Sequence, residues 1–291
     1  MFGDIRPRFL ECLYIRHMIS IMGTQDTIKP ALPKDQQMHP NLKRRLRAGE
    51  TLVGSMITIA SSEIAEIMAM AGFDWLFIDG EHGPLEPADV RTLLIAAKGT
   101  PCLVRVPAID EVPIKKALDL GAAGVIVPQV NSAQQAARVV DMCRYPPVGS
   151  RGTGLARAHG YGNTFQQYIE TANDNLLVVV QAEHKAAVDA IEDIVVVDGI
   201  DCVFLGPYDL SASYGKTGQL DDPEITDAIA KVETVCKANN MPLGFFGLNP
   251  AAVEPYIERG FNLVCVGVDT VLLSSGAGRI LKTLRNNDSK S

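Results

Sequence analysis

The stretch W-L-F-I-D-G-E-H, residues 75–82, is an apolar run that ends in an acid, with a second acid and a histidine close behind. Two later stretches share this design: L-L-V-V-V-Q-A-E at 176–183 and V-F-L-G-P-Y-D at 203–209. Continuous apolar runs of this length are typical of strands covered on both faces, and parallel sheets carry their chemistry at the carboxyl ends of such strands. The three stretches therefore predict a parallel α/β protein with a metal site at that edge.

Eight such runs can be counted from residue 41 onward, and amphipathic, helix-like segments separate most of them. Eight alternations predict a closed (β/α)8 TIM barrel, with residues 41–291 as a single domain. An open doubly wound sheet is the alternative, but no Gly-x-Gly-x-x-Gly follows an early strand. The predicted strands are Leu52–Ile57, Trp75–Asp79, Cys102–Val106, Gly124–Pro128, Leu176–Gln181, Asp201–Leu205, Leu243–Gly247 and Leu263–Val268.

Composition favours a small-molecule enzyme. The chain has 291 residues, 47% of them hydrophobic, which suffices for one barrel. A net charge of -7 provides no basic field, which argues against nucleic acid and membrane surfaces as partners. No apolar stretch approaches the roughly 20 residues that span a bilayer. Six scattered cysteines without a Cys-x-x-Cys pair indicate reduced thiols, so we expect a soluble, cytoplasmic protein.

Two segments depart from the alternation of strands and helices. Residues 1–40 mix arginines with short apolar pieces, and we expect an extension outside the fold, either a flexible tail or the product of an early start codon. The segment from Tyr145 to Tyr161 contains P-P-V-G-S-R-G-T-G at 146–154. We expect this loop on the same rim as the acids, as a surface connection or as a contact to substrate.

Acids and an amide follow two neighbouring predicted strands. Gln181 and Glu183 point to one face by the period of two, and Asp209 leaves the next strand at the same level. Two carboxylates with water suit magnesium or manganese, which keep positions open for a ligand. Alternatively, Glu183 pairs with Lys185, and Asp209 caps the turn at 210–213.

A cation and a histidine follow two other predicted strands. Arg105 ends an otherwise apolar strand, so it needs a carboxylate or an anionic ligand, and Asp79 or Glu81 could be that partner. His82 directly follows its strand, where a general base would be useful near neutral pH. A purely structural role for His82 is the alternative.

Six strings, taken together and in order, resemble the HpcH/HpaI family of class II, metal-dependent pyruvate aldolases, such as the 4-hydroxy-2-oxoheptanedioate and 2-dehydro-3-deoxyglucarate aldolases. The likeness spans about residues 41–285. It implies a barrel of the type that handles phosphoenolpyruvate and pyruvate, and reversible cleavage of 4-hydroxy-2-oxo acids to pyruvate and an aldehyde. The strings are F-D-W-L-F-I-D-G-E-H-G-P at 73–84, L-V-R-V-P at 103–107, R-Y-P-P-V-G-S-R-G at 144–152, V-V-V-Q-A-E at 178–183, F-L-G-P-Y-D-L-S at 204–211 and C-V-G-V-D-T at 265–270.

The resemblance assigns roles to the residues at matching positions. Glu183 and Asp209 become ligands of a divalent cation, Mg²⁺, Mn²⁺ or Co²⁺, and Gln181 binds substrate or a water on that cation. Arg105 steadies the enolate oxygen, and His82 is the base. This assignment agrees with the chemistry expected of a Lewis acid, a fixed positive charge and a titratable imidazole.

Further residues are implied by the same likeness. Asp119 would raise the basicity of the histidine by reaching it from a neighbouring subunit. The backbone around Gly206, Pro207 and Tyr208 would hold the pyruvate carboxylate. Asp79 and Glu81 match acids that act near the metal through water.

The resemblance also implies a homo-oligomer, a hexamer built as a dimer of trimers, in which neighbours exchange the last helix, here Val271–Leu284. The chain departs from the better-studied aldolases at two places. Tyr208 replaces a small residue, and Phe245-Phe246 replaces an aliphatic pair. Both changes are expected to narrow the pocket where the aldehyde binds.

Two other functions fit the same residues. An oxaloacetate or 2-oxo acid decarboxylase would form the same enolate with the same metal and arginine. A barrel that binds a carboxylate ligand without catalysis is a third hypothesis, disfavoured by the intact set of residues from His82 to Asp209.

Overall fold

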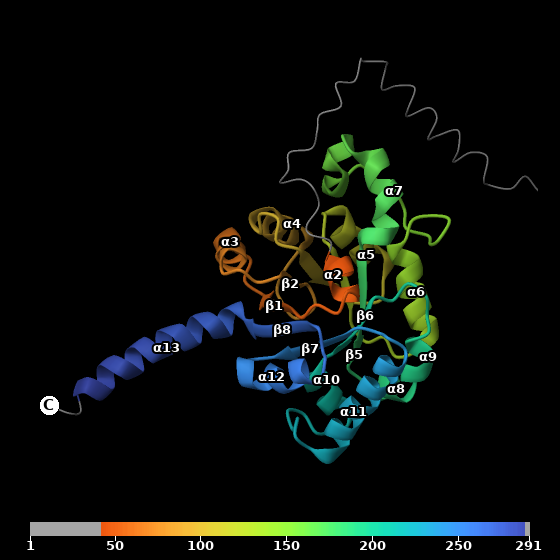
Figure 1. The fold of residues 1–291 in the computed structure, drawn as a ribbon. Coiled ribbons are helices and arrows are strands. Elements are labelled where there is room, and N and C mark those ends of the chain that lie inside the picture. The colour runs from red at the N-terminus through yellow and green to blue at the C-terminus, as the bar shows by residue number, and fades with distance from the viewer. Residues whose placement is uncertain (1–41, 289–291) are drawn as a thin grey trace, which may run out of the picture. The chain divides into compact units, whose positions relative to one another are not determined.

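The computed structural model describes residues 42–288, with side chains to residue 285. The extension predicted for residues 1–40 lies outside the described residues. Within them, eight parallel strands form a closed barrel, so the predicted TIM barrel is confirmed (Figure 1). The strands are β1 (Leu52–Ile57), β2 (Trp75–Asp79), β3 (Cys102–Arg105), β4 (Gly124–Val127), β5 (Leu177–Ala182), β6 (Cys202–Leu205), β7 (Leu243–Gly247) and β8 (Leu263–Val268).

Helices surround this barrel, and polar caps explain where several begin. Ser61, Asp110 and Ser132 accept hydrogen bonds from backbone N–H groups in the first turns of α3, α5 and α6. Asp222 does the same for α11, which has proline at its first position. The helices are α2 (Leu42–Arg47), α3 (Ser62–Met70), α4 (Pro87–Ala96), α5 (Glu111–Asp119), α6 (Ala133–Cys143), the 3-10 helix η1 (Arg157–Gly162), α7 (Phe165–Asn175), α8 (Lys185–Asp189), α9 (Ile191–Ile194), α10 (Pro207–Ser213), α11 (Pro223–Ala238), α12 (Pro250–Glu258) and α13 (Asp269–Asp288).

Successive side chains of a strand point to opposite faces. Each strand therefore contributes to two hydrophobic cores, one inside the barrel and one between the barrel and the helices. On β2, Trp75 and Phe77 pack inside the barrel, whereas Leu76 and Ile78 pack against the surrounding helices. Glycine makes room for the large interior side chains. A Cβ atom at position 244 would lie 2.2 Å from the ring of Phe204.

Helix α2 covers the amino-terminal end of the barrel. Leu42 and Leu46 pack with the interior core, four residues apart on one helix face. Lys43 Nζ lies 3.0 Å from the buried carboxylate of Asp201, just before β6, and Arg47 Nη2 lies 2.9 Å from it. Sequence analysis did not predict this helix, whose six residues are too few to show a periodic pattern.

The segment from Tyr145 to Tyr161 lies at the amino-terminal end of the barrel, so its predicted place on the rim with the acids was wrong. Arg144, which directly precedes it, donates hydrogen bonds to the carbonyl of Leu176 and to Asp201, at the starts of β5 and β6. The physical reason is connectivity: the segment follows α6, and each outer helix returns the chain to the amino-terminal ends of the strands.

The cysteines Cys102, Cys143, Cys202, Cys236 and Cys265 are buried and free of disulfides. Burial raises the pKa of the Cys102 thiol to about 12, which keeps it protonated and inert. In the part of the chain that the structure describes, no helix combines the length and apolar character that crossing a membrane requires.

Candidate active site

The strand register places charged groups inside the carboxyl end of the barrel. Asp79, the last residue of β2, is paired in register with Arg105, the last residue of β3. Both follow interior residues by the period of two, so their side chains continue the inward-facing rows of Phe77 and Leu103. Gln181 is inward-facing on β5 for the same reason, two residues after Val179.

Asp79 and Arg105 form a buried, bidentate ion pair. Arg105 Nε and Nη2 donate to the two Asp79 carboxylate oxygens at 2.9 and 2.8 Å. Burial acts to raise the pKa of Asp79, but the hydrogen bonds and charge of Arg105 outweigh it, and the pKa is lowered. The backbone N–H groups of Glu81 and His82 also donate to Asp79. Asp79 therefore stays ionised and fixes both the guanidinium and the loop after β2.

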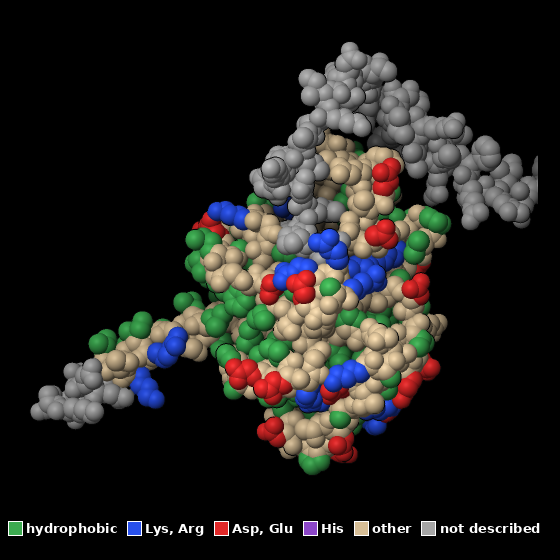
Figure 2. Space-filling view, in the orientation of Figure 1, with side chains coloured by type: hydrophobic (Ala, Val, Ile, Leu, Met, Phe, Trp, Pro, Cys, Tyr) green, Lys and Arg blue, Asp and Glu red, His purple; other side chains and the backbone are tan. Residues whose placement is uncertain are grey.

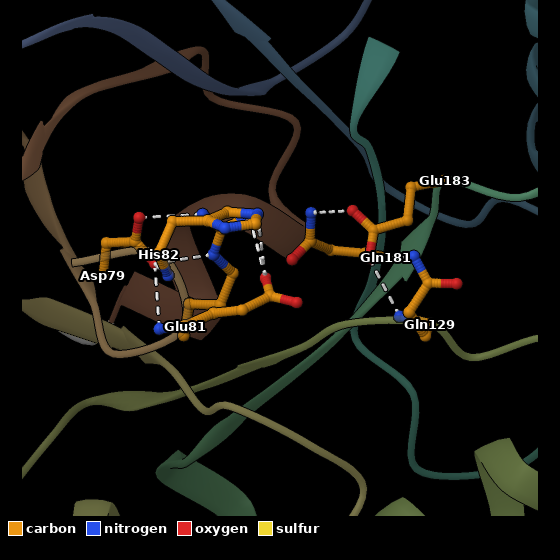
Figure 3. Close-up of polar contacts among 7 residues, drawn as sticks. Asp79, Glu81, His82, Gln129, Gln181 and Glu183 are labelled. Carbon is orange, nitrogen blue, oxygen red and sulfur yellow. Dashed lines mark hydrogen bonds and ion pairs between the residues drawn. The ribbon is translucent and has the colours of Figure 1, made fainter. Parts of the chain in front are cut away.

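Glu81 and His82 occupy that loop, and Figure 3 shows them beside Asp79. Glu81 Oε2 lies 3.1 Å from Arg105 Nη1, so Arg105 contacts both Asp79 and Glu81, the latter through a different nitrogen. Burial is the main reason that the pKa of Glu81 is raised. The His82 side chain is 64% exposed, with Nε2 3.9 Å from Glu81 Oε2. The imidazole is thus the most accessible of these groups and open to a ligand.

Glu183 is held on the other side of the site by two amides (Figure 3). Gln129 donates its backbone N–H at 2.9 Å and its side-chain amide at 3.3 Å to Oε1. Gln181 Nε2 donates to Oε2 at 2.8 Å. Gly206 allows this packing, because a Cβ atom there would lie 2.7 Å from Glu183 Oε2. The alternative pairing with Lys185 is wrong: that lysine pairs with Asp189.

The pKa of Glu183 is raised to about 7, chiefly by burial and further by the negative charges of Glu81 and Asp209. Asp209 lies in the first turn of α10, and no described residue donates a hydrogen bond to its carboxylate. Together with Asp79, four acids gather here, and Arg105 interacts with three of them: Asp79, Glu81 and Glu183. The site therefore carries an excess of negative charge that would favour a bound cation.

These groups border one cavity of about 440 Å³ at the carboxyl end of the barrel, within the usual range for ligand sites. Its floor is aromatic, formed by Phe77 and Phe204 at a centroid distance of 6.0 Å. Glu183 and Glu81 are not among the lining residues but contact two that are, Gln181 and Arg105 respectively. The residues that line it are Met56, Thr58, Phe77, Asp79, His82, Arg105, Gln181, Phe204, Gly206, Pro207, Tyr208, Asp209 and Phe246.

The donor atoms fit a hard divalent cation. Gln181 Oε1 is buried and accepts no hydrogen bond from the described residues, although its amide nitrogen is engaged. This oxygen and the carboxylates of Glu183 and Asp209 are the ligand type that Mg²⁺ or Mn²⁺ prefers. Residues 42–288 contain no closed cluster of three His, Cys, Asp or Glu side chains suited to a metal. A site with two carboxylates instead leaves positions for water and substrate.

Asp119 is the predicted site residue that lies far from the cavity of its own chain, with no contact to the described residues that line it. It ends α5, whose carboxyl end leads to the start of β4 and so lies at the amino-terminal end of the barrel. Its carboxylate accepts a hydrogen bond at 2.7 Å from Arg151 Nη2. The Arg151 side chain is fully buried against the ring of Tyr145. In one subunit Asp119 and His82 are therefore at opposite ends of the barrel.

Sequence analysis missed some residues and placed others correctly. Gln129 follows the apolar run of β4 and has a positive φ of 54°, and a polar residue directly after a predicted strand was the available signal. Tyr208 and Phe246 line the cavity as expected. Phe245 does not, because its ring stacks on Tyr256 of α12, 3.5 Å between centroids, on the outer face of the barrel.

A closed barrel that gathers acids, a guanidinium and a histidine around one cavity at its carboxyl end belongs to the class of (β/α)8 barrel enzymes. The family model described as HpcH/HpaI aldolase/citrate lyase matches residues 54–275. The chain belongs to this family, as the resemblance in its sequence implied.

Characterised relatives cover most of the chain. It is 39% identical over 252 residues to 2-keto-3-deoxy-L-rhamnonate aldolase from Klebsiella pneumoniae, covering 85% of this chain and 94% of the relative. It is 42% identical over 239 residues to 4-hydroxy-2-oxo-heptane-1,7-dioate aldolase from Salmonella typhimurium, covering 81% and 90%. The crystal structure of an HpcH/HpaI aldolase/citrate lyase family protein from Burkholderia cenocepacia superposes with a TM-score of 0.81 at 36% identity, covering 84% and 98%.

Proposed function

We propose that this barrel is a divalent-metal-dependent class II aldolase, a lyase that reversibly cleaves a 4-hydroxy-2-oxo acid to pyruvate and an aldehyde. The relatives named above are aldolases of 2-oxo acids. The observation that carries the proposal is the convergence of Gln181, Asp209, Arg105 and His82 on one cavity, with Glu183 bound to Gln181. The decarboxylase considered from the sequence has no observation in its favour over the aldolase.

The pyruvate half of the substrate fits the polar side of the cavity. Glu183 and Asp209, with Gln181 Oε1, would hold the cation, which when bound supplies Lewis acidity to the 2-oxo group. The backbone at 206–208 would bind the carboxylate. Arg105, fixed by Asp79, would place a positive charge near the oxygen that becomes negative as the C3–C4 bond breaks.

His82 would accept the proton of the C4 hydroxyl, directly or through water. The electrons of the C3–C4 bond then remain on the pyruvate fragment as an enolate, and the aldehyde leaves. Protonation of the enolate at C3 gives pyruvate, and the addition reaction reverses these steps. The exposed imidazole at the cavity edge supports this role, because it contacts both the cavity and solvent.

Assembly is part of the proposal. Asp119 lies at the end of the barrel away from His82 of the same chain, so a contact between them requires a neighbouring subunit. Helix α13 projects from the barrel (Figure 1), and hydrophobic side chains lie along its surface (Figure 2). The exposed apolar residues of this helix are Leu272, Leu273, Ile280, Leu281 and Leu284. These features support a contact between subunits. We propose that the assembly is a hexamer, a dimer of trimers that exchanges α13, and light scattering after size-exclusion chromatography would measure its mass.

The test is pyruvate release from racemic 4-hydroxy-2-oxoheptanedioate and from 2-keto-3-deoxy sugar acids, with Mg²⁺, Mn²⁺ or Co²⁺ and then with excess EDTA. We expect release that EDTA abolishes. His82→Ala should lose turnover and keep Mn²⁺ binding, measured by calorimetry, whereas Glu183→Ala should lose Mn²⁺ binding. Equal loss of Mn²⁺ in the two variants would contradict these roles. Release that is unaffected by EDTA would contradict the metal-dependent mechanism.

A further inference from the structure

The cavity has a polar side and an apolar side. Asp79, Arg105 and Gln181 come from β2, β3 and β5, whereas Met56 and Phe246 come from β1 and β7. Tyr208, at the start of α10, completes the apolar side, with its ring centroid 6.4 Å from that of Phe246. Tyr208 is 38% exposed, so its ring stands at the cavity edge. We refer to Met56, Tyr208 and Phe246 as the apolar wall.

Charge is distributed unevenly around this wall. Of the described residues that line the cavity, Arg105 is the single lysine or arginine. Its Nε, Nη1 and Nη2 atoms already contact Asp79 and Glu81. The other basic group on the lining, His82, has its Nε2 atom 3.9 Å from Glu81 Oε2. A negative group placed against the apolar wall would therefore be desolvated without a cationic partner.

Lysines on the neighbouring loops do not supply that partner. Lys185, after β5, pairs with Asp189 and lies over the ring of Tyr214. Lys216, after α10, pairs with Asp222 and Glu224. Each of these cations thus has its own carboxylates in the described part of the chain.

We propose that the apolar wall selects the aldehyde, and that the preferred aldehyde carries an uncharged aromatic or similarly apolar group rather than a carboxylate. This inference rests on the proposed function, in which pyruvate occupies the polar side and the C4 substituent must face Met56, Tyr208 and Phe246. The two aromatic rings offer faces and edges for stacking with a planar apolar group. The lack of an uncommitted lysine or arginine among the described residues on the lining disfavours an acidic one.

The experiment compares benzaldehyde with 4-carboxybenzaldehyde as acceptors for pyruvate, in the full-length protein with Mg²⁺ or Mn²⁺. The two aldehydes share a ring and differ by one carboxylate. We expect kcat/KM for benzaldehyde to exceed that for 4-carboxybenzaldehyde by roughly tenfold or more. Equal values, or a preference for the carboxylated aldehyde, would overturn the inference.

Variants of the apolar wall test whether it causes the preference for the uncharged aldehyde. Phe246→Leu and Tyr208→Ala should lower the ratio of the two kcat/KM values, and Tyr208→Arg should lower it further by pairing with the carboxylate. The ratio does not depend on the folded fraction of each preparation. Phe245→Leu is the matched control: its ring lies on the outer face, and the ratio should stay at the wild-type value. If the ratio stayed unchanged in Phe246→Leu and Tyr208→Ala, residues other than the apolar wall would select the aldehyde, which would overturn the inference.

Exchange of the pyruvate methyl protons with D2O separates the two proposals. This exchange requires the polar side of the cavity and no aldehyde. Metal-dependent exchange without the expected aldehyde preference would overturn the inference and leave the aldolase proposal standing. Absence of exchange would overturn both, because the site would not activate pyruvate.

Discussion

Asp79 and Arg105 end adjacent strands in register, and their side chains form two parallel hydrogen bonds inside the barrel. Such a fork fixes the guanidinium in orientation as well as in position. A free arginine on a flexible stem would lose conformational entropy whenever a substrate bound. The pair therefore preorganises the positive charge that the proposed reaction needs.

Replacement of Asp79 by asparagine should test this preorganisation. Asp79→Asn keeps the shape but removes the charge and one of two acceptors, so we expect kcat for pyruvate release to fall roughly a hundredfold. Steady-state kinetics would measure it. Glu81→Gln is the comparison, because Glu81 makes a single contact of 3.1 Å to Arg105. If kcat fell as much in Glu81→Gln as in Asp79→Asn, the bidentate pair of Asp79 and Arg105 would not be what orients the guanidinium.

The raised pKa of Glu183 predicts a pH dependence of stability. Its folded-state pKa of about 7 exceeds the ordinary value of 4.5, so the folded state binds more protons between these pH values. Raising the pH through this window should therefore destabilise the metal-free protein by an amount on the order of 3 kcal/mol from this group. Thermal unfolding in EDTA from pH 4.5 to 8, compared with Glu183→Gln, isolates the contribution.

A bound divalent metal should reverse the loss of stability at high pH. A divalent cation at Glu183 replaces the proton, so Mg²⁺ should raise the Tm of the wild type more at pH 8 than at pH 5.5. The Glu183→Gln variant should show neither the pH-dependent loss nor the gain with Mg²⁺. Parallel Tm curves for the two proteins in EDTA would refute the assigned shift.

The proposed contact of Asp119 with His82 of a neighbouring subunit predicts complementation between inactive variants. His82→Ala and Asp119→Ala should each lose most activity, yet oligomers reassembled from a mixture should regain part of it. The reason is that some interfaces would then pair an intact His82 with an intact Asp119. Pyruvate release after co-refolding measures the gain. If mixed oligomers form and stay as inactive as the parents, Asp119 does not act across subunits.

The tight packing inside the barrel predicts that a substitution at Gly244 lowers the stability of the protein strongly. Gly244→Ala would place a Cβ atom 2.2 Å from the Phe204 ring, and overpacking of this kind costs about 1–3 kcal/mol. Gly154→Ala is the control, because nothing lies within 4 Å of a Cβ atom there. Thermal unfolding should show a lower Tm only for Gly244→Ala. Similar Tm values for both variants would contradict the packing described here.

The sequence by itself determined the barrel and the end of it that carries charge. Strands buried on both faces need continuous apolar runs, so β1, β2, β7 and β8 have their predicted bounds. Strands β3, β4 and β6 differ from the prediction by one residue at one end, and β5 is shifted by one residue at both ends. Because all eight strands are parallel, acids that follow different runs had to meet at one edge. This placed His82, Arg105 and Asp209 together before any coordinates were known.

Only the tertiary structure decided which partners these groups have. Arg105 pairs with Asp79 in a fork because their strands are in register, and Gln129 binds Glu183 across 54 residues of sequence. Asp119 and the segment that follows Arg144 both come at the carboxyl ends of outer helices. They therefore lie at the amino-terminal end of the barrel, away from the acids. The pKa of Glu183 depends on burial and on the charges of Glu81 and Asp209, which follow other strands in the sequence. Such contacts depend on distances between remote residues, which no local pattern in the sequence encodes.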